Sequence, residues 1–355
     1  MLLEGKRVVV TGGTGSLGKV LVKRILSGEQ GAPDSVVVFS RDEAKQHDMR
    51  LSYLRRTVTT DEVIYDNFRH VLEFRIGDVR DYSDVCAVLK DADIVVNAAA
   101  LKQVPTCEYF PGQALFTNCM GALNICRAVS ENGYPVESVV AISTDKACKP
   151  VNVMGMSKAI QERIFIAANI ECPRTRFIAV RYGNVLASRG SVIPLFLEQI
   201  RRSGPVTVTA PEMTRFLLSL DQAVDLVFAA IADARPGETW IPICGSANIV
   251  TLAKALIGDR KIDIEITGAR PGEKMHEVLI SEEEIRHVRR QGEYFVIEPM
   301  LPELVPAGTR GQGPLRREYS SADQTLSLED TSELLSKHGL LPDDLPGRLE
   351  EELLR

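Results

Sequence analysis

The 355-residue sequence has no long hydrophobic run, no organised set of cysteines and no excess of basic residues. Its longest apolar segments are strand-sized, far short of the roughly 20 residues that cross a bilayer. The seven cysteines form no Cys-x-x-Cys pair and have no histidines beside them, so we expect neither disulfides nor a metal site. A net charge of −6 excludes the basic surface that nucleic acids require. No signal peptide precedes the first apolar run, and we expect a cytoplasmic protein without membrane insertion.

Short β-branched runs alternate with helical segments over the first half of the chain. We predict strands at 7–12, 35–40, 72–78, 93–100, 138–144 and 177–183, and helices at 16–28, 82–90, 112–132 and 153–170. Continuous apolar character is typical of strands that are buried on both faces. Their alternation with helices predicts an α/β protein with a Rossmann, doubly wound parallel sheet.

After residue 184 the regular alternation gives way to short segments rich in turn residues. This change predicts a smaller C-terminal lobe, formed by residues 184–220 and 247–340, that binds the substrate over the carboxyl edge of the sheet. Residues 1–183, together with a return of the chain at about 221–246, form the cofactor-binding domain in this interpretation. Residues 341–355 are a C-terminal tail.

The sequence TGGTGSLG directly follows the first predicted strand and opens the first predicted helix. Glycines at this spacing permit a tight turn, close approach of the backbone to a pyrophosphate, and close packing of helix on strand. The amides and the dipole of the helix N-terminus then face the phosphates. The motif therefore predicts a dinucleotide cofactor. The residues expected to bind it here are Gly12, Thr14, Gly15, Ser16, Leu17 and Gly18.

The second predicted strand ends in Ser40 and Arg41, and Lys45 follows one turn later. An acidic residue at this point would hold the ribose of NAD, whereas a hydroxyl and cations suit the 2′-phosphate of NADP. We predict NADP; the alternative is that Arg41 is a solvated loop residue and that Asp42 reads the ribose. Asp78, at the end of the third strand, is placed to accept from the adenine amino group, or else to cap a helix.

Several motifs resemble the extended short-chain dehydrogenase/reductase superfamily, namely TGGTGSLG, GDVRD, NAAA at 97–100, STDK at 143–146 and a lysine that ends a YxxxK-like element. Four more segments are similar to its soluble UDP-N-acetylglucosamine 4,6-dehydratase branch: AAALKQVPTCEYFP, RYGNVLASRGSVIPLF, PEMTRFLLSL and RPGEKMHE. The resemblance covers about residues 5–335.

The resemblance implies an activity on UDP-N-acetylglucosamine in surface-polysaccharide or glycan synthesis. Members of this branch oxidise C4 with tightly bound NADP, which is recycled in each turnover. They then remove the C5 proton, expel the C6 hydroxyl as water, and return the hydride to C6. The resemblance further implies a homo-oligomer, a dimer or larger, and it favours inversion at C5.

Thr144, Asp145 and Lys146 follow the fifth strand, at the carboxyl edge where such sheets bind ligands. Elimination of water needs a base at C5 and an acid at the C6 oxygen. We predict that Lys146 is the base, with its pKa lowered by the positive charges of Lys158 and the nicotinamide. Asp145, protonated through burial, is the predicted acid, and Thr144 would bond the C4 oxygen. The alternative is a helix cap beside an ordinary ion pair.

Met154 occupies the position at which most of the superfamily has the tyrosine that accepts the C4 hydroxyl proton. Lys158 retains the lysine that binds the ribose. Because a thioether accepts no proton, we expect the proton to leave through Thr144, Asp145 or an ordered water.

Further contacts follow from the resemblance. Arg215 and Arg270 are the expected pyrophosphate ligands, because a planar guanidinium can bind two phosphate oxygens. The alternatives left open are a surface role for Lys102 and an ion pair between Glu273 and Lys274. The other expected cofactor contacts are Val79, Ala98, Ala99, Ala100, Asn118, Ser143, Tyr182 and Asn184. The expected substrate contacts are Lys102, Asn184, Val192, Ile193, Pro194, Thr207, Met213, Arg215, Arg270 and Glu273.

Two other functions stay open on the sequence alone. A nucleotide-sugar 4-epimerase would share the fold, the cofactor and the pocket. It carries out no elimination, however, and so has no need of an acid and a base such as Asp145 and Lys146. An NADP-binding regulator without catalytic activity would explain Met154, but it would not need the substrate contacts.

Overall fold

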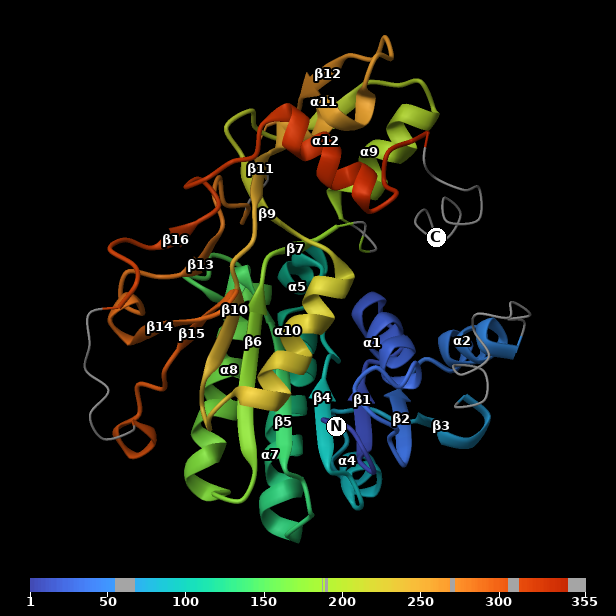
Figure 1. The fold of residues 1–355 in the computed structure, drawn as a ribbon, viewed down its shortest axis with the longest axis vertical. Coiled ribbons are helices and arrows are strands. Elements are labelled where there is room, and N and C mark those ends of the chain that lie inside the picture. The colour runs from blue at the N-terminus through green and yellow to red at the C-terminus, as the bar shows by residue number, and fades with distance from the viewer. Residues whose placement is uncertain (55–67, 187, 189–190, 269–271, 306–312, 344–355) are drawn as a thin grey trace.

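The computed structural model describes residues 1–54, 68–186, 188, 191–268, 272–305 and 313–343. Its main feature in this part of the chain is a nine-stranded sheet with helices on both faces, which carries a smaller lobe at one end (Figure 1). In spatial order the strands are β14 (Val288–Gln291), β15 (Tyr294–Ile297), β10 (Thr239–Pro242), β6 (Arg176–Tyr182), β5 (Ser138–Thr144), β4 (Ile94–Asn97), β1 (Arg7–Thr11), β2 (Ser35–Ser40) and β3 (Leu72–Ile76).

The strands from β10 to β3 run parallel, and the chain order reverses between β1 and β4. Open sheets of this kind bind ligands in the crevice outside the carboxyl ends of the strands at such a reversal. The site is therefore expected above the ends of β1, β4 and β5.

Helices cover both faces of the sheet because its central strands, such as β1, β2 and β4, are apolar and buried at nearly every position. Val8 and Val10 face one hydrophobic cluster, whereas Val9 between them faces the other. Successive side chains of a strand point to opposite faces, so both layers of helices obtain an apolar surface. The first layer contains α1 (Ser16–Leu26), α2 (Glu43–Leu54) and α10 (Leu220–Asp233). The second contains α4 (Tyr82–Leu89), α7 (Gly121–Asn132) and α8 (Val153–Glu171).

The predicted helix at 112–132 consists of several pieces. Two short helices, α5 (Val104–Tyr109) and α6 (Pro111–Ala114), lead into a π-helical segment, η2 (Leu115–Met120), before α7 begins. Within η2, Asn118 accepts from the backbone of Leu101 at 2.8 Å and donates to Ser157 Oγ at 2.9 Å. Such π-turns occur frequently at functional sites. Here the segment ties the loop after β4 to helix α8.

The smaller lobe has its own hydrophobic core, which includes Phe196, Leu252 and Leu335. The chain first enters the lobe at β7. It then leaves twice to form strands of the large sheet, and it returns to the lobe each time (Figure 1). Its elements are β7 (Asn184–Val185), α9 (Val192–Arg201), β8 (Val206–Val208), β9 (Thr214–Leu218), β11 (Ser246–Asn248), α11 (Ile249–Ile257), β12 (Ile264–Ile266), β13 (Val278–Ile280), β16 (Tyr319–Ser320) and α12 (Leu328–Lys337). Short 3-10 turns lie at η3 (Asp145–Ala147), η4 (Ile285–His287) and η5 (Pro302–Leu304).

The α/β class with a Rossmann-type parallel sheet is confirmed, and residues 221–246 return to the sheet as most of α10 and β10. One boundary differs from the prediction. Residues 288–297, which we assigned to the lobe, form β14 and β15 and extend the sheet with two antiparallel strands. They cover the edge of β10, which would otherwise expose backbone groups beside a buried core. None of the helices in the described residues has the length and apolarity needed to span a bilayer.

Candidate active site

A cavity of about 1320 Å³ lies along the carboxyl edge of the sheet and extends to the lobe. Pockets for one small molecule usually measure about 300 to 1,000 Å³. This cavity therefore has room for a dinucleotide and a second ligand side by side. Its wall combines the glycine loop after β1, the ends of β2, β4 and β5, the start of α8, and residues of the lobe.

The glycine loop has the shape that a pyrophosphate requires. Gly12 has φ +65°, and a Cβ there would lie 2.7 Å from the backbone N of Ala99. A Cβ on Gly18 would lie 2.5 Å from Cα of Gly13. No side chain caps the N-terminus of α1, and no acidic residue lies in its first turn. The free amides and the helix dipole therefore face the cavity, and this cradle fits a dinucleotide phosphate.

The end of β2 presents a hydroxyl and cations to the same cavity. Arg41 Nη1 lies 3.7 Å from Asp78 Oδ2, and Lys45 pairs with Asp42 at 2.7 Å. The carboxylate of Asp78 is also held by the guanidinium of Arg80, at 2.6 Å. These neighbours keep the pKa of Asp78 below its ordinary value despite partial burial, which opposes the shift. Asp78 is therefore an anion at neutral pH and can accept a hydrogen bond.

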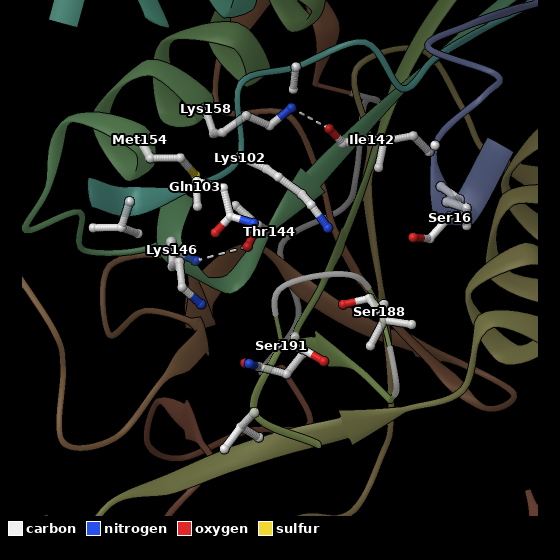
Figure 2. Close-up of a pocket in the computed structure, with 18 of the residues that line it drawn as sticks. Ser16, Lys102, Gln103, Ile142, Thr144, Lys146, Met154, Lys158, Ser188 and Ser191 are labelled. Atoms are coloured by element: carbon white, nitrogen blue, oxygen red, sulfur yellow. Dashed lines mark hydrogen bonds between the residues drawn. The ribbon is translucent and has the colours of Figure 1, made fainter. Parts of the chain in front are cut away.

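The turn after β5 brings the STDK residues together. Thr144 Oγ1 donates to Asp145 Oδ1 at 2.9 Å, and Lys146 Nζ donates to the same oxygen at 3.0 Å. Asp145 is fully buried and does not line the cavity, whereas Thr144 and Lys146 do (Figure 2). The Asp145 carboxylate thus holds its two neighbours from behind the cavity wall. Its Oδ2 has no hydrogen-bond partner among the described residues.

A second carboxylate reaches Lys146 from the lobe. Glu277, which precedes β13, places Oε1 3.2 Å from Lys146 Nζ. Burial alone would lower the pKa of Lys146, but the negative charges of Asp145 and Glu277 outweigh it and raise the pKa above the ordinary value. The positive charge of Arg215 lowers the pKa of Lys146, but by less than the two anions raise it. Our prediction of a lowered pKa concerns the protein with the nicotinamide bound; without that ring, the two anions that flank this lysine dominate its pKa.

Helix α8 supplies the other two predicted catalytic side chains. Lys158 donates to the carbonyl of Ile142 at 2.5 Å and also bonds Gln161 (Figure 2). Burial lowers the pKa of Lys158 to about 8. Met154 is buried in a small apolar cluster with Cys107 and also reaches the cavity. The site therefore has no phenol at the position where the superfamily has one.

The catalytic turn rests on a buried ionic network. The Arg181 guanidinium pairs with Glu162 at 2.7 Å and with Glu284 at 2.9 Å, and all three side chains are almost inaccessible to solvent. Glu162 also accepts from Ser143 Oγ at 2.5 Å, one residue before the turn. The network thus joins β6, α8 and the segment after β13 directly behind Thr144. Full pairing is what allows three charges to be buried together.

Most predicted residues line this one cavity. Three do not: Asp145 and Asn118 lie behind the wall, and Ile193 belongs to the core of the lobe. Arg270 lies outside the described residues. The predicted residues that line the cavity are Gly12, Thr14, Gly15, Ser16, Leu17, Gly18, Ser40, Arg41, Lys45, Asp78, Val79, Ala98, Ala99, Ala100, Lys102, Ser143, Thr144, Lys146, Met154, Lys158, Tyr182, Asn184, Val192, Pro194, Thr207, Met213, Arg215 and Glu273.

Sequence reasoning missed Glu277, Asn152 and Gln103, all of which line the cavity. Asn152 caps α8 through the amide of Gly155 and donates to the carbonyl of Gly272, so it joins the catalytic helix to the lobe. The signal for Glu277 was present, because it ends the RPGEKMHE segment. Its distance from Lys146 in the sequence gave no hint that the two side chains meet. One alternative left open was an ion pair between Glu273 and Lys274. In the structure Lys274 donates to the carbonyl of Cys148 at 2.6 Å.

The reversed strand order, the glycine cradle and the STDK turn at the carboxyl edge together define a Rossmann-type nucleotide-binding fold with a candidate active site. Within that class, the chain belongs to the polysaccharide biosynthesis protein family, whose model matches residues 8–299.

Similar proteins include two named UDP-glucose 4-epimerase. The one from Rickettsia bellii (strain OSU 85-389) is 41% identical, and the match covers 93% of this chain and 95% of that protein. The one from Rickettsia conorii is also 41% identical, with the same coverage. Among solved structures, Pen from Bacillus thuringiensis has a TM-score of 0.84 at 32% identity, covering 96% of this chain and all of that one. The dTDP-glucose 4,6-dehydratase DesIV from Streptomyces venezuelae shares the fold, with a TM-score of 0.64 at 20% identity. The match covers 76% of this chain and 86% of the DesIV chain.

Proposed function

We propose that this protein is a nicotinamide-dependent nucleotide-sugar enzyme, and more specifically a UDP-N-acetylglucosamine 4,6-dehydratase that inverts C5. The observation that carries the proposal is the pair of carboxylates around Lys146 beside the cofactor cradle, in a cavity with Met154 where a tyrosine would stand. An elimination needs an acid and a base side by side, which this arrangement supplies.

The cofactor in this proposal is NADP. The glycine loop would hold its pyrophosphate, Asp78 its adenine, and Lys158 its ribose. When bound, NADP supplies the oxidising and reducing equivalents for C4 and C6. The absence of an acidic residue at Ser40 and the exposed guanidinium of Arg41 support the 2′-phosphate. Some neighbours in fold were solved with NAD, so a direct comparison of the two cofactors is part of the test.

The substrate would occupy the half of the cavity that faces the lobe. Arg215 is the proposed ligand of the pyrophosphate; its guanidinium is buried beside Glu277 and Met213. Thr207, on β8, would lie against the uracil, and Asn184, the first residue of β7, would lie against the sugar or a phosphate. These assignments place the hexose next to Lys146 and Thr144.

Lys146, once neutral, would take the C5 proton after the neighbouring C4 has become a ketone. Thr144 lines the cavity beside the amine, and its hydroxyl would turn from Asp145 Oδ1 to donate a hydrogen bond to that ketone oxygen. Asp145 would orient both groups, through hydrogen bonds of 2.9 and 3.0 Å to the same oxygen. In this assignment Asp145 is a positioning residue, since its carboxylate is fully buried.

UDP-sugar 4-epimerase is the second candidate, favoured by the names of the rickettsial relatives. An epimerase would use the same cradle and pocket. It would leave the Lys146 base without a task, because epimerisation at C4 breaks no bond at C5 or C6.

Mass spectrometry of the nucleotide-sugar product separates these functions. The purified protein is incubated with UDP-N-acetylglucosamine or with UDP-glucose, with NADP or with NAD. We expect loss of about 18 mass units from the UDP-N-acetylglucosamine sample, because one water leaves. A new chromatographic peak of unchanged mass, shown by NMR to be the C4 epimer, would establish the epimerase instead, and no new peak with any pair would refute both. NMR of the product reads the configuration at C5.

Lys146→Ala tests the assigned base. We expect this variant to lose the exchange of the C5 hydrogen with solvent deuterium, whereas Lys337→Ala, an exposed lysine on α12, should keep it. Undiminished exchange in Lys146→Ala would contradict the role of Lys146.

We also propose a homo-oligomer. Large apolar side chains are exposed on adjacent helices from α6 to α8, including Phe116 at 55%, Met156 at 47% and Ile160 at 47%. Exposed apolar surface on this scale marks association sites. Light scattering coupled to gel filtration measures the state, and a monomer at micromolar concentration would contradict it.

A further inference from the structure

Glu277 is a buried carboxylate of the cavity that the proposed function leaves without a role. Its side chain is 2% exposed and lines the cavity next to Lys146. Oε1 lies 3.2 Å from Lys146 Nζ and 3.8 Å from Arg215 Nε. Oε2 has no hydrogen-bond partner among the described residues. A buried oxygen without a donor is costly, so it requires an explanation.

The backbone of Glu277 is fixed, which gives its carboxylate a defined position. Its N–H donates to Ser321 Oγ at 2.9 Å, and its carbonyl accepts from the N–H of Ser321 at 2.8 Å. The charged groups around the carboxylate are the ammonium of Lys146, the guanidinium of Arg215, and Lys274 Nζ at 3.9 Å from Oε2. A pre-organised group of this kind is suited to proton transfer in a site from which substrate has displaced water.

Asp145 is less well placed to reach a substrate. It contacts the same lysine, but its carboxylate is fully buried and does not line the cavity. Its free Oδ2 lies behind Gly183: a Cβ on that glycine would lie 3.4 Å from the oxygen. Of the two carboxylates on Lys146, only Glu277 reaches the space where a hexose would lie.

We propose that Glu277 is the general acid that protonates the departing C6 oxygen, with Lys146 as the base at C5. This inference rests on the dehydratase function proposed above. It assigns to Glu277 the role that the sequence suggested for Asp145.

The proton balance closes within this pair. Lys146 first transfers a proton to Glu277, which gives a neutral amine and a carboxylic acid. The amine then removes the C5 proton, the C5–H electrons form the C5=C6 bond, and the C6–O bond breaks with its electron pair. The departing oxygen takes the proton of Glu277 and leaves as water, so that Glu277 is again a carboxylate. After C6 has been reduced, C5 takes a proton from water on the face opposite Lys146, which inverts C5. Lys146 is by then an ammonium again, and the proton released earlier from the C4 hydroxyl replaces the one that water gave.

The test compares two leaving groups. A hydroxyl needs a proton to leave, whereas fluoride leaves without one, so a missing acid affects only the first. Wild type and Glu277→Gln are given UDP-N-acetylglucosamine and its 6-deoxy-6-fluoro analogue, with product mass and 19F NMR as readouts. We expect Glu277→Gln to lose about a hundredfold or more in rate with the hydroxyl substrate. It should keep the fluoride reaction to within about tenfold of wild type, because loss of the Glu277 charge lowers the pKa of Lys146, which can then release its proton to water.

Glu282→Gln, an exposed glutamate of the same segment, should react like wild type with both substrates. Bound cofactor and the melting temperature are measured for every variant. Should Glu277→Gln not fold, Glu277→Asp replaces it and should show the same selective loss, because its acid is one methylene short.

Equal losses with both substrates in a folded variant would overturn the proposal, since that result indicates a structural or base-related role. Undiminished hydroxyl elimination would overturn it as well, and selective loss in Asp145→Asn alone would move the acid to Asp145. Failure of the parent function has a different signature. In that case wild type itself gives no product lighter by one water, whatever the variants do.

Discussion

Replacing Lys158 by methionine should change how the stability of the protein depends on pH. The lysine is 5% exposed, and within the part of the chain that the structure describes its ammonium has only the Ile142 carbonyl and Gln161 as hydrogen-bond partners. Burial lowers its pKa from 10.5 to about 8, although the nearby Glu162 opposes the shift. A methionine has similar length and flexibility and carries no charge.

The magnitude follows from the two pKa values. A shift of about 2.5 units corresponds to about 3 kcal/mol of free energy, at about 1.4 kcal/mol per unit. Below about pH 8 the lysine is charged in the folded and in the unfolded protein, and the buried charge destabilises the folded protein by the full amount. Between about pH 8 and pH 10.5 the folded state releases its proton first, and this destabilisation disappears. Stability from this group therefore increases with pH, by about 2 kcal/mol between about pH 7 and pH 9.5.

Urea unfolding of the cofactor-free protein measures the effect. The single tryptophan, Trp240, is buried in β10 and reports the transition by fluorescence. Lys158→Met also removes a hydrogen bond to the Ile142 carbonyl, at a cost of about 1 to 3 kcal/mol that is nearly independent of pH. The informative quantity is therefore the difference between the pH profiles of the variant and wild type, in which all other titrating groups cancel. Lys337→Met, at an exposed position on α12, is the control and should follow wild type.

We expect Lys158→Met to lack the gain of about 2 kcal/mol between about pH 7 and pH 9.5. Parallel profiles for the variant and wild type would refute the reasoning, since they would mean that Lys158 titrates normally despite its burial.

Three further predictions concern the support and the walls of the site. Arg181→Met leaves two buried carboxylates unpaired, so urea unfolding should show a loss of about 3 to 5 kcal/mol, and a loss below about 1 kcal/mol would contradict the network. Gly12→Ala forces a Cβ against Ala99 at positive φ, so we expect about 1 to 3 kcal/mol of destabilisation. Calorimetry should also show NADP binding that is at least tenfold weaker. Unchanged binding would disprove the cradle. Met154→Tyr should alter turnover by less than about tenfold, since the proposed protons move elsewhere; a much larger gain would mean that the phenol restores a missing base.

The sheet and the cofactor half of the site were predictable because their signals are local. A strand buried on both faces is recognised from a run such as VVVT, and the glycine loop lies within a few residues of it. Predicted strands and helices therefore agree with the structure to within a few residues. The STDK turn was found for the same reason, because it directly follows β5.

The rest depends on contacts between distant segments. Glu277 is 131 positions from Lys146, and no periodicity or motif spacing in the sequence predicts that the two side chains meet. The sequence did not reveal that the pKa of Lys146 is raised in the ligand-free protein, because one of its two flanking anions was unknown. The return of β14 and β15 to the sheet was missed as well, since two strands of four residues resemble other short segments of the lobe.

The interleaved path of the chain constrains how such an enzyme can acquire a new substrate. Residues that line the lobe side of the cavity come from two excursions of the chain, which runs back through α10 and β10 between them. A single recombination event therefore cannot transplant the whole specificity pocket from one homologue to another. Engineered chimeras would need several junctions at once, so stepwise substitution within each excursion is the more accessible route to altered sugar preference.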